Sequence, residues 1–319
     1  MELAIRRYCP EDREEWNGFV KESRNATFLF DRGYMDYHSS RFQDCSWIAS
    51  KGGKTIALLP ANIDAGGVLH SHQGLTYGGW LLPPTHLDGA DLLEIFTEAV
   101  EIWKREGIKA LDYKPVPFIY SSKPSEEDIY ALFRLGARVS EVNLSSALNL
   151  SLHPDYNKLR RRSLKKASEI SFNIVETEDA RTFMRLTAAC LAERHDTVPV
   201  HTADEILLLR DRFPENIRMF LLIREGESEP DAGVMIYDTG TVVHAQYIAS
   251  TEAGRRLNLL TPLFNWLITV RYSSRRYFDF GISNEDNGRY LNEGLLRQKF
   301  SYGATGVSYS RWYLPIEDL

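Results

Sequence analysis

The sequence predicts an α+β fold, with a mixed α/β sheet, in which two halves of the chain repeat the same order of elements. In the C-terminal half, a β-branched and aromatic run at 242–250 and a short aromatic run at 277–281 are each typical of a strand, and apolar residues recur at helical spacing at 259–268. Parallel strands joined by a crossover helix bind ligands at the strand ends. We therefore expect the functional site of this half where these two strands end.

A constant offset between the halves indicates an internal repeat. Asp112 and Gly136 are 24 positions apart, and so are Asp279 and Gly303. The offset that aligns these residues, 167 positions, also aligns the strand and helix that open each half. Two halves of equal length and equal element order favour a duplicated domain.

The duplication predicts an N-terminal domain at 1–150, a basic linker helix at 151–168 and a C-terminal domain at 169–319 that carries the active site. Alternating patterns predict the strands of the first domain, and amphipathic spacing with acidic first turns predicts its helices. The strands are expected at 2–8, 45–50, 54–63, 68–80 and 110–114. The helices are expected at 11–22, at 32–42, from Asp88 or Asp91 to 105, and from Ser125 to Gly136.

The C-terminal domain opens with a strand and a helix within 170–193. A second helix starts at Thr202, and Asn292 can cap a last helix that ends at Gly303, because glycine readily takes the left-handed conformation after a helix. Pro262 is tolerated in the first turn of the crossover helix. The remaining strands are expected at 219–224, 233–238 and 307–314.

Composition restricts the class of protein. The chain of 319 residues is 43% hydrophobic and 26% charged, as in globular proteins, and its net charge of −6 argues against a surface that coats nucleic acid. The charged start and the lack of a run of about 18 apolar residues predict neither a signal peptide nor a membrane span. Three widely spaced cysteines, Cys9, Cys45 and Cys190, fit a reducing compartment. We therefore expect a cytoplasmic protein.

The polar turn Thr-Glu-Ala-Gly-Arg-Arg at 251–256 lies where the first parallel strand enters the crossover helix. Backbone N–H groups at a helix N-terminus, with arginines beside them, favour a pyrophosphate or a carboxylate. The alternative is an ordinary strand-to-helix turn with surface arginines. In the first interpretation the residues that bind the cofactor or donor are Gly254, Arg255, Arg256 and Asn258.

A basic segment separates the two halves. Six basic residues occur in the nine positions from Lys158 to Lys166, and Pro154, before them, suits the first turn of a helix. In one interpretation this helix binds phosphate groups of a nucleotide-linked substrate, of CoA or of RNA. In the other, it is a solvated face of a net-negative protein. The pattern favours neither interpretation.

The order of elements resembles the second half of the GNAT acyltransferase fold, and the closing segment is similar to the FemAB-like branch of that superfamily. The similarity is carried by Asp279-Phe280-Gly281, by Gly294-Leu295-Leu296-Arg297-Gln298-Lys299-Phe300 and by Tyr302-Gly303. The branch includes the peptidoglycan interpeptide-bridge aminoacyl transferases and many acetyltransferase-like proteins. The resemblance implies two tandem GNAT-like (acyl-CoA N-acyltransferase) domains over nearly the whole chain.

The resemblance further implies transfer of an acyl or aminoacyl group to an amine of a small molecule or of a peptidoglycan or other cell-envelope precursor. The donor is then acetyl-CoA or another acyl-CoA, or an aminoacyl-tRNA, which makes tRNA a possible partner. The turn at 251–256 keeps one glycine where active GNAT proteins have an Arg/Gln-x-x-Gly-x-Gly/Ala pattern. The equivalent Leu81-Leu82-Pro83-Pro84 of the first half lacks N–H donors at its prolines, so that half is expected to complete the site rather than to form a second one.

The loop between the first two helices of a GNAT-like domain lies over the acceptor site, which makes its basic residues candidate substrate contacts by resemblance. Without the resemblance they are ordinary surface residues of a loop that contains proline. The glycine-rich segment at 72–80 can line the cleft. The residues expected to bind substrate are Arg194, His195, His72, Tyr77, Asn292 and Arg297, with His201 as a further loop candidate.

Acyl transfer to an amine requires a base for the incoming ammonium, a donor for the carbonyl oxyanion and an acid for the leaving group. The catalytic candidates near the strand ends are Asp279, Lys299, His244 and Tyr247. Alternation along the strand places His244 and Tyr247 on opposite faces, so only one of them is expected to face the cleft. Asp279 is either catalytic or one partner of a structural ion pair with Lys299 or Arg297.

No metal is expected, because His70 and His72 share a strand face without a third ligand at a useful spacing. The sequence therefore predicts an N-acyltransferase, either an acetyltransferase or a FemAB-like aminoacyltransferase. The alternative is a non-catalytic ligand-binding protein that keeps the cleft but has a degenerate GNAT donor site.

Overall fold

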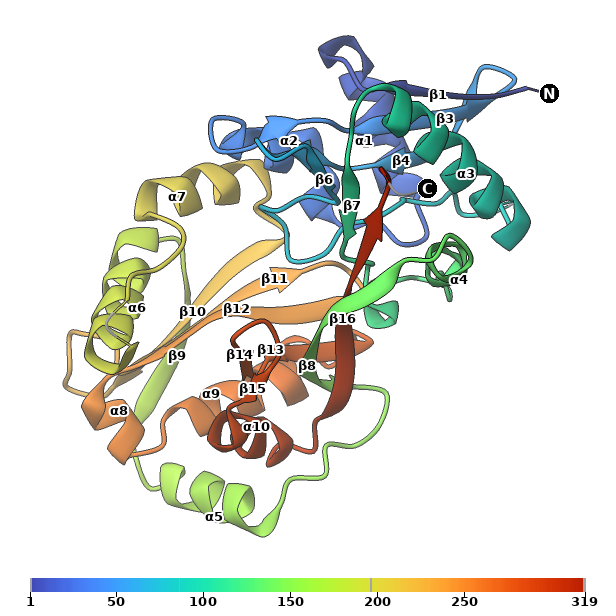
Figure 1. The fold of residues 1–319 in the computed structure, drawn as a ribbon. Coiled ribbons are helices and arrows are strands. Elements are labelled where there is room, and N and C mark those ends of the chain that lie inside the picture. Colours follow the sequence, from blue (N-terminus) through green and yellow to red (C-terminus); the bar gives the residue numbers. More distant parts are fainter. Residues whose placement is uncertain (1, 86, 196, 318–319) are drawn as a thin grey trace. The chain divides into compact units, whose positions relative to one another are not determined.

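The computed structural model describes residues 2–85, 87–195 and 197–317, and Figure 1 shows its helices and strands. The chain divides into two compact units. Unit 1 comprises 1–144, 286–289 and 308–319, and unit 2 comprises 145–285 and 290–307.

Unit 1 contains two sheets. Its strands are β1 (Leu3–Arg7), β2 (Gln43–Asp44), β3 (Trp47–Lys51), β4 (Lys54–Leu59), β5 (Asn62–Ile63), β6 (Val68–His70), β7 (Ala110–Tyr113) and the second part of β16 (Thr305–Pro315). One sheet has the order β1-β3-β4, and the other has the order β2-β5-β6-β7-β16. Only β6 and β7 are parallel in these pairings, and α3 (Gly89–Arg105) connects them.

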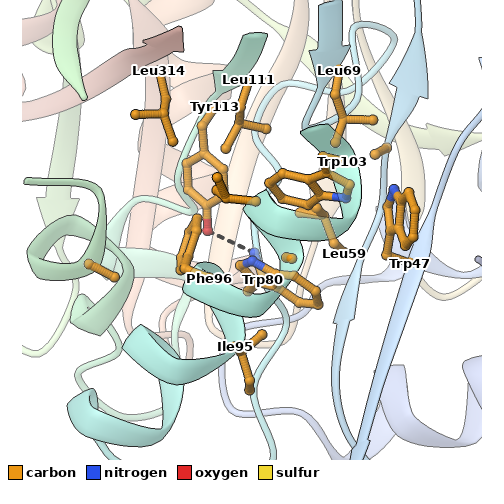
Figure 2. Packing of buried hydrophobic residues seen from close by; sticks show 14 of the residues in the cluster. Trp47, Leu59, Leu69, Trp80, Ile95, Phe96, Trp103, Leu111, Tyr113 and Leu314 are labelled. Carbon is orange, nitrogen blue, oxygen red and sulfur yellow. Dashed lines mark hydrogen bonds between the residues drawn. The ribbon is translucent and has the colours of Figure 1, made fainter. Parts of the chain in front are cut away.

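The other helices of unit 1 are α1 (Arg13–Glu22), α2 (Arg32–Met35) and α4 (Glu127–Arg134), with 3₁₀ turns at Pro10–Asp12, Phe28–Phe30, Asp36–His38 and Phe118–Tyr120. Helix α3 begins as the sequence predicts, because the Asp88 side chain accepts from the N–H of Asp91 and the Asp91 side chain accepts from the N–H of Asp88. Its apolar face, with Phe96 and Trp103, packs on the parallel strands (Figure 2). The Tyr113 hydroxyl accepts a hydrogen bond from the Trp80 N–H at 2.8 Å in this core.

Unit 2 contains one mixed sheet of order β8-β13-β12-β11-β10-β9. Its strands are the end of β8 (Arg138–Asn149), β9 (Phe172–Thr177), β10 (Ile217–Arg224), β11 (Ala232–Asp238), β12 (Val242–Ser250) and β13 (Tyr277–Ile282), with a small hairpin of β14 (Asn284–Glu285) and β15 (Tyr290–Leu291). Its helices are α5 (Lys158–Ala167), α6 (Ala180–His195), α7 (Ala203–Arg212), α8 (Glu252–Arg256), α9 (Leu260–Trp266), which continues as a π-helix at Leu267–Arg271, and α10 (Glu293–Phe300).

The duplicated order of elements is visible in both units. In each, a parallel strand pair, β6–β7 or β12–β13, is bordered by an antiparallel strand on the side of the second strand. That bordering strand is the end of β16 in unit 1 and the end of β8 in unit 2, so each half of the sequence supplies a strand to the other unit.

Several local predictions are wrong, among them the helix at 32–42, which ends at Met35, and the strand at 54–63, which is interrupted after Leu59. The segment 251–256 is not a plain turn, because residues 252–256 form α8, with the Thr251 side chain accepting from the Gly254 N–H. Helix α5 starts after Asn157, whose side chain accepts from the Arg160 N–H, so Pro154 lies before the helix rather than in its first turn. The strand expected at 68–80 ends at His70.

Candidate functional site

The parallel strands of unit 2 separate at a defined point. β12 and β13 pair from Val242 with Tyr277 to His244 with Asp279. Beyond this last pair, Ile248 of β12 and Phe280 of β13 both line a pocket of about 980 Å³. A pocket therefore begins where the ladder of backbone hydrogen bonds between β12 and β13 stops, at the strand ends where the sequence predicts the site.

A β-bulge places His244 and Tyr247 on the same face of the sheet. Tyr247 pairs with Met235 and Ala245 with Ile236, which leaves Gln246 as an extra residue. An extra residue shifts the alternation of side chains by one position. The sequence-based expectation that His244 and Tyr247 lie on opposite faces is thus wrong.

The last paired position joins a histidine and a buried carboxylate. The Nδ1 atom of His244 lies 2.9 Å from Oδ2 of Asp279, and Asp279 is 0% exposed. The other carboxylate oxygen accepts hydrogen bonds from the Ser145 hydroxyl at 2.6 Å and from the Gly281 N–H at 3.0 Å. These three contacts fix the carboxylate and orient the imidazole, so that Nε2 is the ring atom turned away from Asp279.

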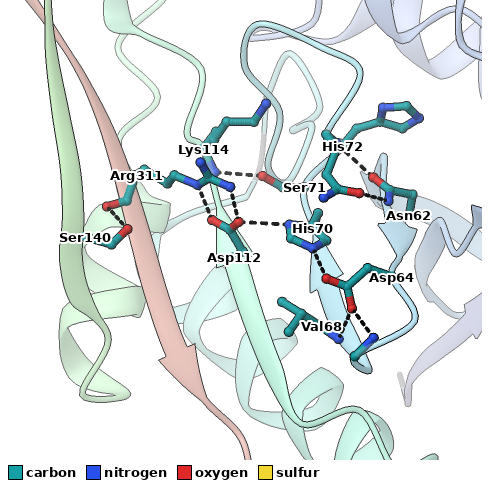
Figure 3. Close-up of polar contacts among 12 residues, drawn as sticks. Asn62, Asp64, Val68, His70, Ser71, His72, Asp112, Lys114, Ser140 and Arg311 are labelled. Atoms are coloured by element: carbon teal, nitrogen blue, oxygen red, sulfur yellow. Dashed lines mark hydrogen bonds and ion pairs between the residues drawn. The ribbon is translucent and has the colours of Figure 1, made fainter. Parts of the chain in front are cut away.

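Unit 1 contains the same pair at the same register. His70 and Asp112 are partners on the parallel strands β6 and β7, and Nδ1 of His70 lies 2.8 Å from Oδ2 of Asp112 (Figure 3). Here Nε2 of His70 is occupied by Asp64 at 2.9 Å, and Arg311 binds both oxygens of Asp112. The unit 1 pair is therefore enclosed in an ion network.

The ion network changes the pKa values of its members. Burial by itself lowers the pKa of His70, but hydrogen bonds to Asp112 and Asp64 raise it above its ordinary value. Burial raises the pKa of Asp112, but Arg311 and His70 outweigh it and lower this pKa to about 2. A histidine held between two carboxylates is stabilised as a cation, which suits a structural role better than proton transfer.

Tyr247 is held by the segment before α7. Its hydroxyl lies 2.7 Å from Nδ1 of His201 and 3.3 Å from the His201 N–H. Burial raises the pKa of Tyr247, although the hydrogen bond from the His201 backbone opposes the shift. The hydroxyl therefore keeps its proton at neutral pH.

The pocket combines cations with apolar walls. Its apolar lining comes from Ile248, Phe264, Phe280 and Tyr302, and its cations are Arg160, Arg255, Arg297 and Lys299. No aspartate or glutamate is among the described residues that line it. Such a lining suits a ligand with an apolar part and a negatively charged part.

Lys299 lies on the pocket wall as a buried amine. Its Nζ donates to the carbonyl of Gly281 at 2.8 Å and to that of Ile282 at 2.5 Å. Burial lowers the pKa of Lys299 to about 8, although the nearby carboxylate of Asp279 opposes this shift. The amine is thus mostly charged at neutral pH, and it ties α10 to the end of β13.

Arg160 of α5 is the pocket cation held most firmly. It is buried, its guanidinium lies 4.0 Å from the centre of the Tyr302 ring, and it donates to the hydroxyls of Ser301 and Thr261. The sequence shows Arg160 only as one member of a basic run, and no local pattern separates it from the exposed cations beside it.

The residues predicted to bind the donor divide into two groups. Gly254, Arg255 and Asn258 line the pocket, whereas Arg256 is exposed and is not among the lining residues. Arg255 donates to the Ser250 carbonyl at 2.7 Å and pairs with Glu193. Asn258 takes a left-handed φ of 57° after α8.

Gly254 is required by packing. A Cβ atom there would lie 2.3 Å from the Asp231 carbonyl oxygen and 2.6 Å from the Ser250 hydroxyl. The Gly254→Ala variant should therefore lose about 1–3 kcal/mol of unfolding free energy, as in other overpacked sites. Gly294 is the matched control, because its Cβ would meet only the Asn292 side chain, at 3.6 Å, so Gly294→Ala should be neutral or slightly stabilising. Equal losses in urea denaturation of the two variants would contradict this assignment.

The predicted substrate residues do not all reach this pocket. Arg297 lines it and pairs with Glu293 at 2.6 Å, and Asn292 caps α10 by accepting from the Leu295 N–H. His72 and Tyr77 belong to unit 1, where both are buried. The side chains of Arg194 and His195 lie outside the described residues.

His72 has two further features. Its φ is 70°, in the left-handed region. Burial, together with the nearby His38, lowers its pKa to about 3, so the imidazole is neutral at physiological pH.

Within the part of the chain that the structure describes, no group of three or more His, Cys, Asp or Glu side chains is arranged to hold a metal ion. Nor does that part contain a helix long and apolar enough to span a bilayer.

Comparison with known proteins agrees with this architecture. Residues 156–290 match the family model of the acetyltransferase (GNAT) domain, and no curated protein matches the chain. The structure of FemX aligns with a TM-score of 0.70 at 12% identity, covering 100% of this chain and 98% of that one. A tandem GNAT protein from the clavulanic acid biosynthesis pathway gives a TM-score of 0.55 at 13% identity, with 99% of both chains covered. L-PGS from Bacillus licheniformis gives 0.60 at 12% identity, with 95% of this chain and 91% of that chain covered.

These matches confirm the predicted fold of two tandem GNAT-like domains. The domain family supports N-acyl transfer in general as the reaction class. Residues 156–290 therefore match the acetyltransferase (GNAT) domain family, and the chain as a whole has the tandem GNAT-like fold of these solved structures.

Proposed function

We propose that unit 2 transfers an acyl group from a phosphate-bearing donor to the amine of a second substrate, with His244 and Asp279 as the catalytic pair. The observation that carries this proposal is the position of the pair, at the point where β12 and β13 separate and the pocket begins. The acceptor class implied by the FemAB-like resemblance is an amine on a small molecule or a cell-envelope precursor.

The pocket suits the donor. Phe264, Phe280 and Ile248 form an apolar wall on the α9 side of the sheet, where an acyl chain or a pantetheine arm loses contact with water. Arg160, Arg255 and Lys299 supply positive charge for phosphate groups. Acyl-CoA is the donor that fits both features of the pocket. An aminoacyl-tRNA offers the same ester chemistry and phosphate charge.

The pair faces the other side of the sheet from this apolar wall. Val243 and Ala245 belong to the α9 core, so His244, between them, projects from the opposite face together with Tyr247. Transfer therefore requires the acyl carbon of a donor in the pocket to reach the pair between the unpaired parts of β12 and β13. The acceptor amine approaches from the face of His244.

The chemical steps then follow from the positions of the side chains. Nε2 of His244 removes a proton from the acceptor ammonium, and Asp279 stabilises the imidazolium that forms. The amine nitrogen attacks the acyl carbon, the new C–N bond forms, and the C–S bond of a thioester or the C–O bond of an aminoacyl ester breaks. The hydroxyl of Tyr247, which keeps its proton, donates it to the leaving thiolate or alkoxide. The nitrogen of the new C–N bond loses its second proton to the tyrosinate, which restores the hydroxyl, and the imidazolium of His244 releases its proton to solvent.

The first test is binding and turnover. Acetyl-CoA at about 100 times its Kd should add roughly 2.7 kcal/mol to the unfolding free energy. Release of free CoA thiol in the presence of a panel of amines, including a UDP-linked muramyl peptide, tests transfer itself. Stabilisation by acetyl-CoA without thiol release from any amine would favour the non-catalytic ligand-binding protein.

Cysteine labelling tests where the donor binds. Cys190 lines the pocket, whereas Cys9 is exposed in unit 1. Saturating CoA should slow alkylation of Cys190 at least tenfold and leave the rate at Cys9 unchanged, as followed by mass spectrometry of the peptides. Equal protection of both cysteines, or of neither, would contradict the assignment of the pocket to the donor.

Adjacent arginines provide a test of the charge on α8. Arg255→Ala should weaken binding of acetyl-CoA by about tenfold, the loss of one charge-assisted contact, because Arg255 lines the pocket. Arg256→Ala changes net charge equally but removes an exposed side chain that is not among the lining residues. Titration calorimetry should thus find near-wild-type affinity for Arg256→Ala.

The pKa of Lys299 predicts how the affinity for the donor depends on pH. Its pKa of about 8 means that the amine loses its charge between pH 7 and pH 9. Affinity for an anionic donor should therefore fall over this interval in the wild type and stay constant in Lys299→Met. Parallel pH profiles for the two proteins would show that the amine does not contact the donor.

A further inference from the structure

One face of α5 is strongly basic. The helix buries Arg160 and Ala167 and contains no acidic residue. Its exposed cations are Lys158, Arg161, Arg162, Lys165 and Lys166, which we call the α5 basic face. At about 100° per residue these five side chains fall within an arc of roughly 140°, so they form one continuous surface. The net charge of the whole chain is −6, so this surface is a local exception.

The positive charges of this face are not explained by stabilisation of the helix itself. Lys165 and Lys166 lie in the last turn, where cations favour the helix dipole, but Lys158 and Arg161 lie in the first turn, where they oppose it. Over the described residues, the ion pair formed by this face joins Arg161 to Asp155 at 3.8 Å, and the Asp155 side chain is 96% exposed. Such a pair contributes little. The α5 basic face is therefore left to interact with an anionic partner outside the chain.

Apolar side chains border the α5 basic face. Leu159 of α5 is 66% exposed, and Leu295 and Phe300 of α10 are 37% and 40% exposed. All three line the pocket, as does Arg160. Figure 1 shows α5 at the edge of unit 2, where it packs against α9.

The mixture of cations and aliphatic side chains distinguishes between two kinds of polyanion. Surfaces that bind single-stranded nucleic acid present aromatic rings on which bases stack. Helices that lie on membranes combine lysine and arginine with leucine and phenylalanine, which enter the headgroup region. Leucine dominates beside the α5 basic face, which favours lipid.

We propose that the α5 basic face docks unit 2 on an anionic lipid surface, with Leu159 among the headgroups and the pocket beside that surface. The docking is independent of the transfer chemistry. It would bring the pocket to acceptors or donors that are held at a membrane.

Sedimentation of the full chain with lipid vesicles tests this proposal. The protein should bind vesicles of phosphatidylcholine mixed with phosphatidylglycerol, should not bind phosphatidylcholine alone, and should be released by high salt. The double variant Arg162→Glu, Lys166→Glu should bind at least tenfold more weakly, because each basic side chain near an anionic leaflet contributes about fivefold. Leu159→Ser should weaken binding severalfold at unchanged net charge.

Two controls distinguish vesicle binding by the α5 basic face from a general effect of net charge and from an effect of the pocket. Lys104→Glu, Arg105→Glu makes the same charge change on the exposed end of α3 in unit 1 and should leave vesicle binding intact. Lys299→Met, which alters the pocket, should also bind vesicles like the wild type, so a failure of the proposed transfer reaction leaves this result standing. The proposal is overturned if anionic vesicles do not bind, if the α3 variant loses binding equally, or if single-stranded RNA binds more tightly than vesicles and displaces them.

Discussion

Replacing His244 with glutamine should lower kcat for acyl transfer by about 10²- to 10⁴-fold, with little change in KM for the donor. Glutamine keeps a polar side chain of similar size beside Asp279 but cannot take up a proton at neutral pH. The loss should therefore appear in the step that removes the proton from the ammonium. Steady-state kinetics with the acetyl-CoA and amine pair identified by thiol release would measure it.

The repeat supplies a matched control for this variant. His70 occupies the same register position in unit 1 and makes the same Nδ1 contact with a carboxylate. Its Nε2 is held by Asp64, so His70 is not available to take a proton from a substrate. His70→Gln should therefore destabilise unit 1 without a comparable loss of kcat. Similar losses of kcat in the two variants would mean that His244, too, acts only through the fold.

An Asp279 variant and rescue by added imidazole test whether His244 is the catalytic base. Asp279→Asn keeps the shape of the side chain and removes the charge that stabilises the imidazolium, so kcat should fall while the protein stays folded. His244→Ala leaves space for a small base, and added imidazole should restore part of its activity but none to Asp279→Asn. An absence of rescue, together with full activity of Asp279→Asn, would assign the base to another residue.

Several features of this site follow from the sequence because they depend on neighbouring residues. The capping pair Asp88 and Asp91 starts α3 where predicted. The 24-residue spacing identifies Asp112 and Asp279 as equivalent residues of the two halves. In the structure, each lies opposite a histidine in a pair of parallel strands. Helix caps and repeat spacings are patterns of residue types at fixed distances along the chain, so they can be recognised in a single sequence.

Other features depend on contacts that no local pattern records. Ser145, which donates to Asp279, is 134 positions away in sequence and comes from the strand that crosses into unit 2. The bulge at Gln246 reverses the alternation of β12, and the sequence there reads as an uninterrupted strand. Gly254 reads as a ligand-binding glycine, but its missing side chain also makes room for the Asp231 carbonyl. In each case the partner is fixed by tertiary packing.

Asp112→Asn should lower the unfolding free energy of unit 1 by about 2–4 kcal/mol near pH 6, because it breaks a largely buried ion network. The variant leaves Arg311 and His70 without the carboxylate that both of them bind. Denaturation followed by tryptophan fluorescence reports mainly on this unit, since Trp266 is the tryptophan of unit 2 and the others belong to unit 1.

The pH dependence of this loss follows from two pKa shifts of opposite sign. The pKa of His70 is raised on folding, so its contribution is complete below its ordinary value of about 6.5 and disappears as pH rises through the folded value. The pKa of Asp112 is lowered to about 2, so its contribution is complete above about pH 4 and disappears as pH falls towards 2. The difference between wild type and Asp112→Asn should therefore be largest between about pH 4 and 6.5.

A second buried carboxylate serves as the control for the histidine. Asp238 of unit 2 binds Arg275 at 2.8 Å, and no histidine among the described residues hydrogen-bonds its side chain. Asp238→Asn should lower stability by a similar amount, but the loss should not shrink between pH 6.5 and pH 9, because an arginine keeps its charge throughout. If the cost of Asp112→Asn were also constant over that interval, His70 would not be the cation of the network, and the unit 1 pair would be held together by Arg311 alone.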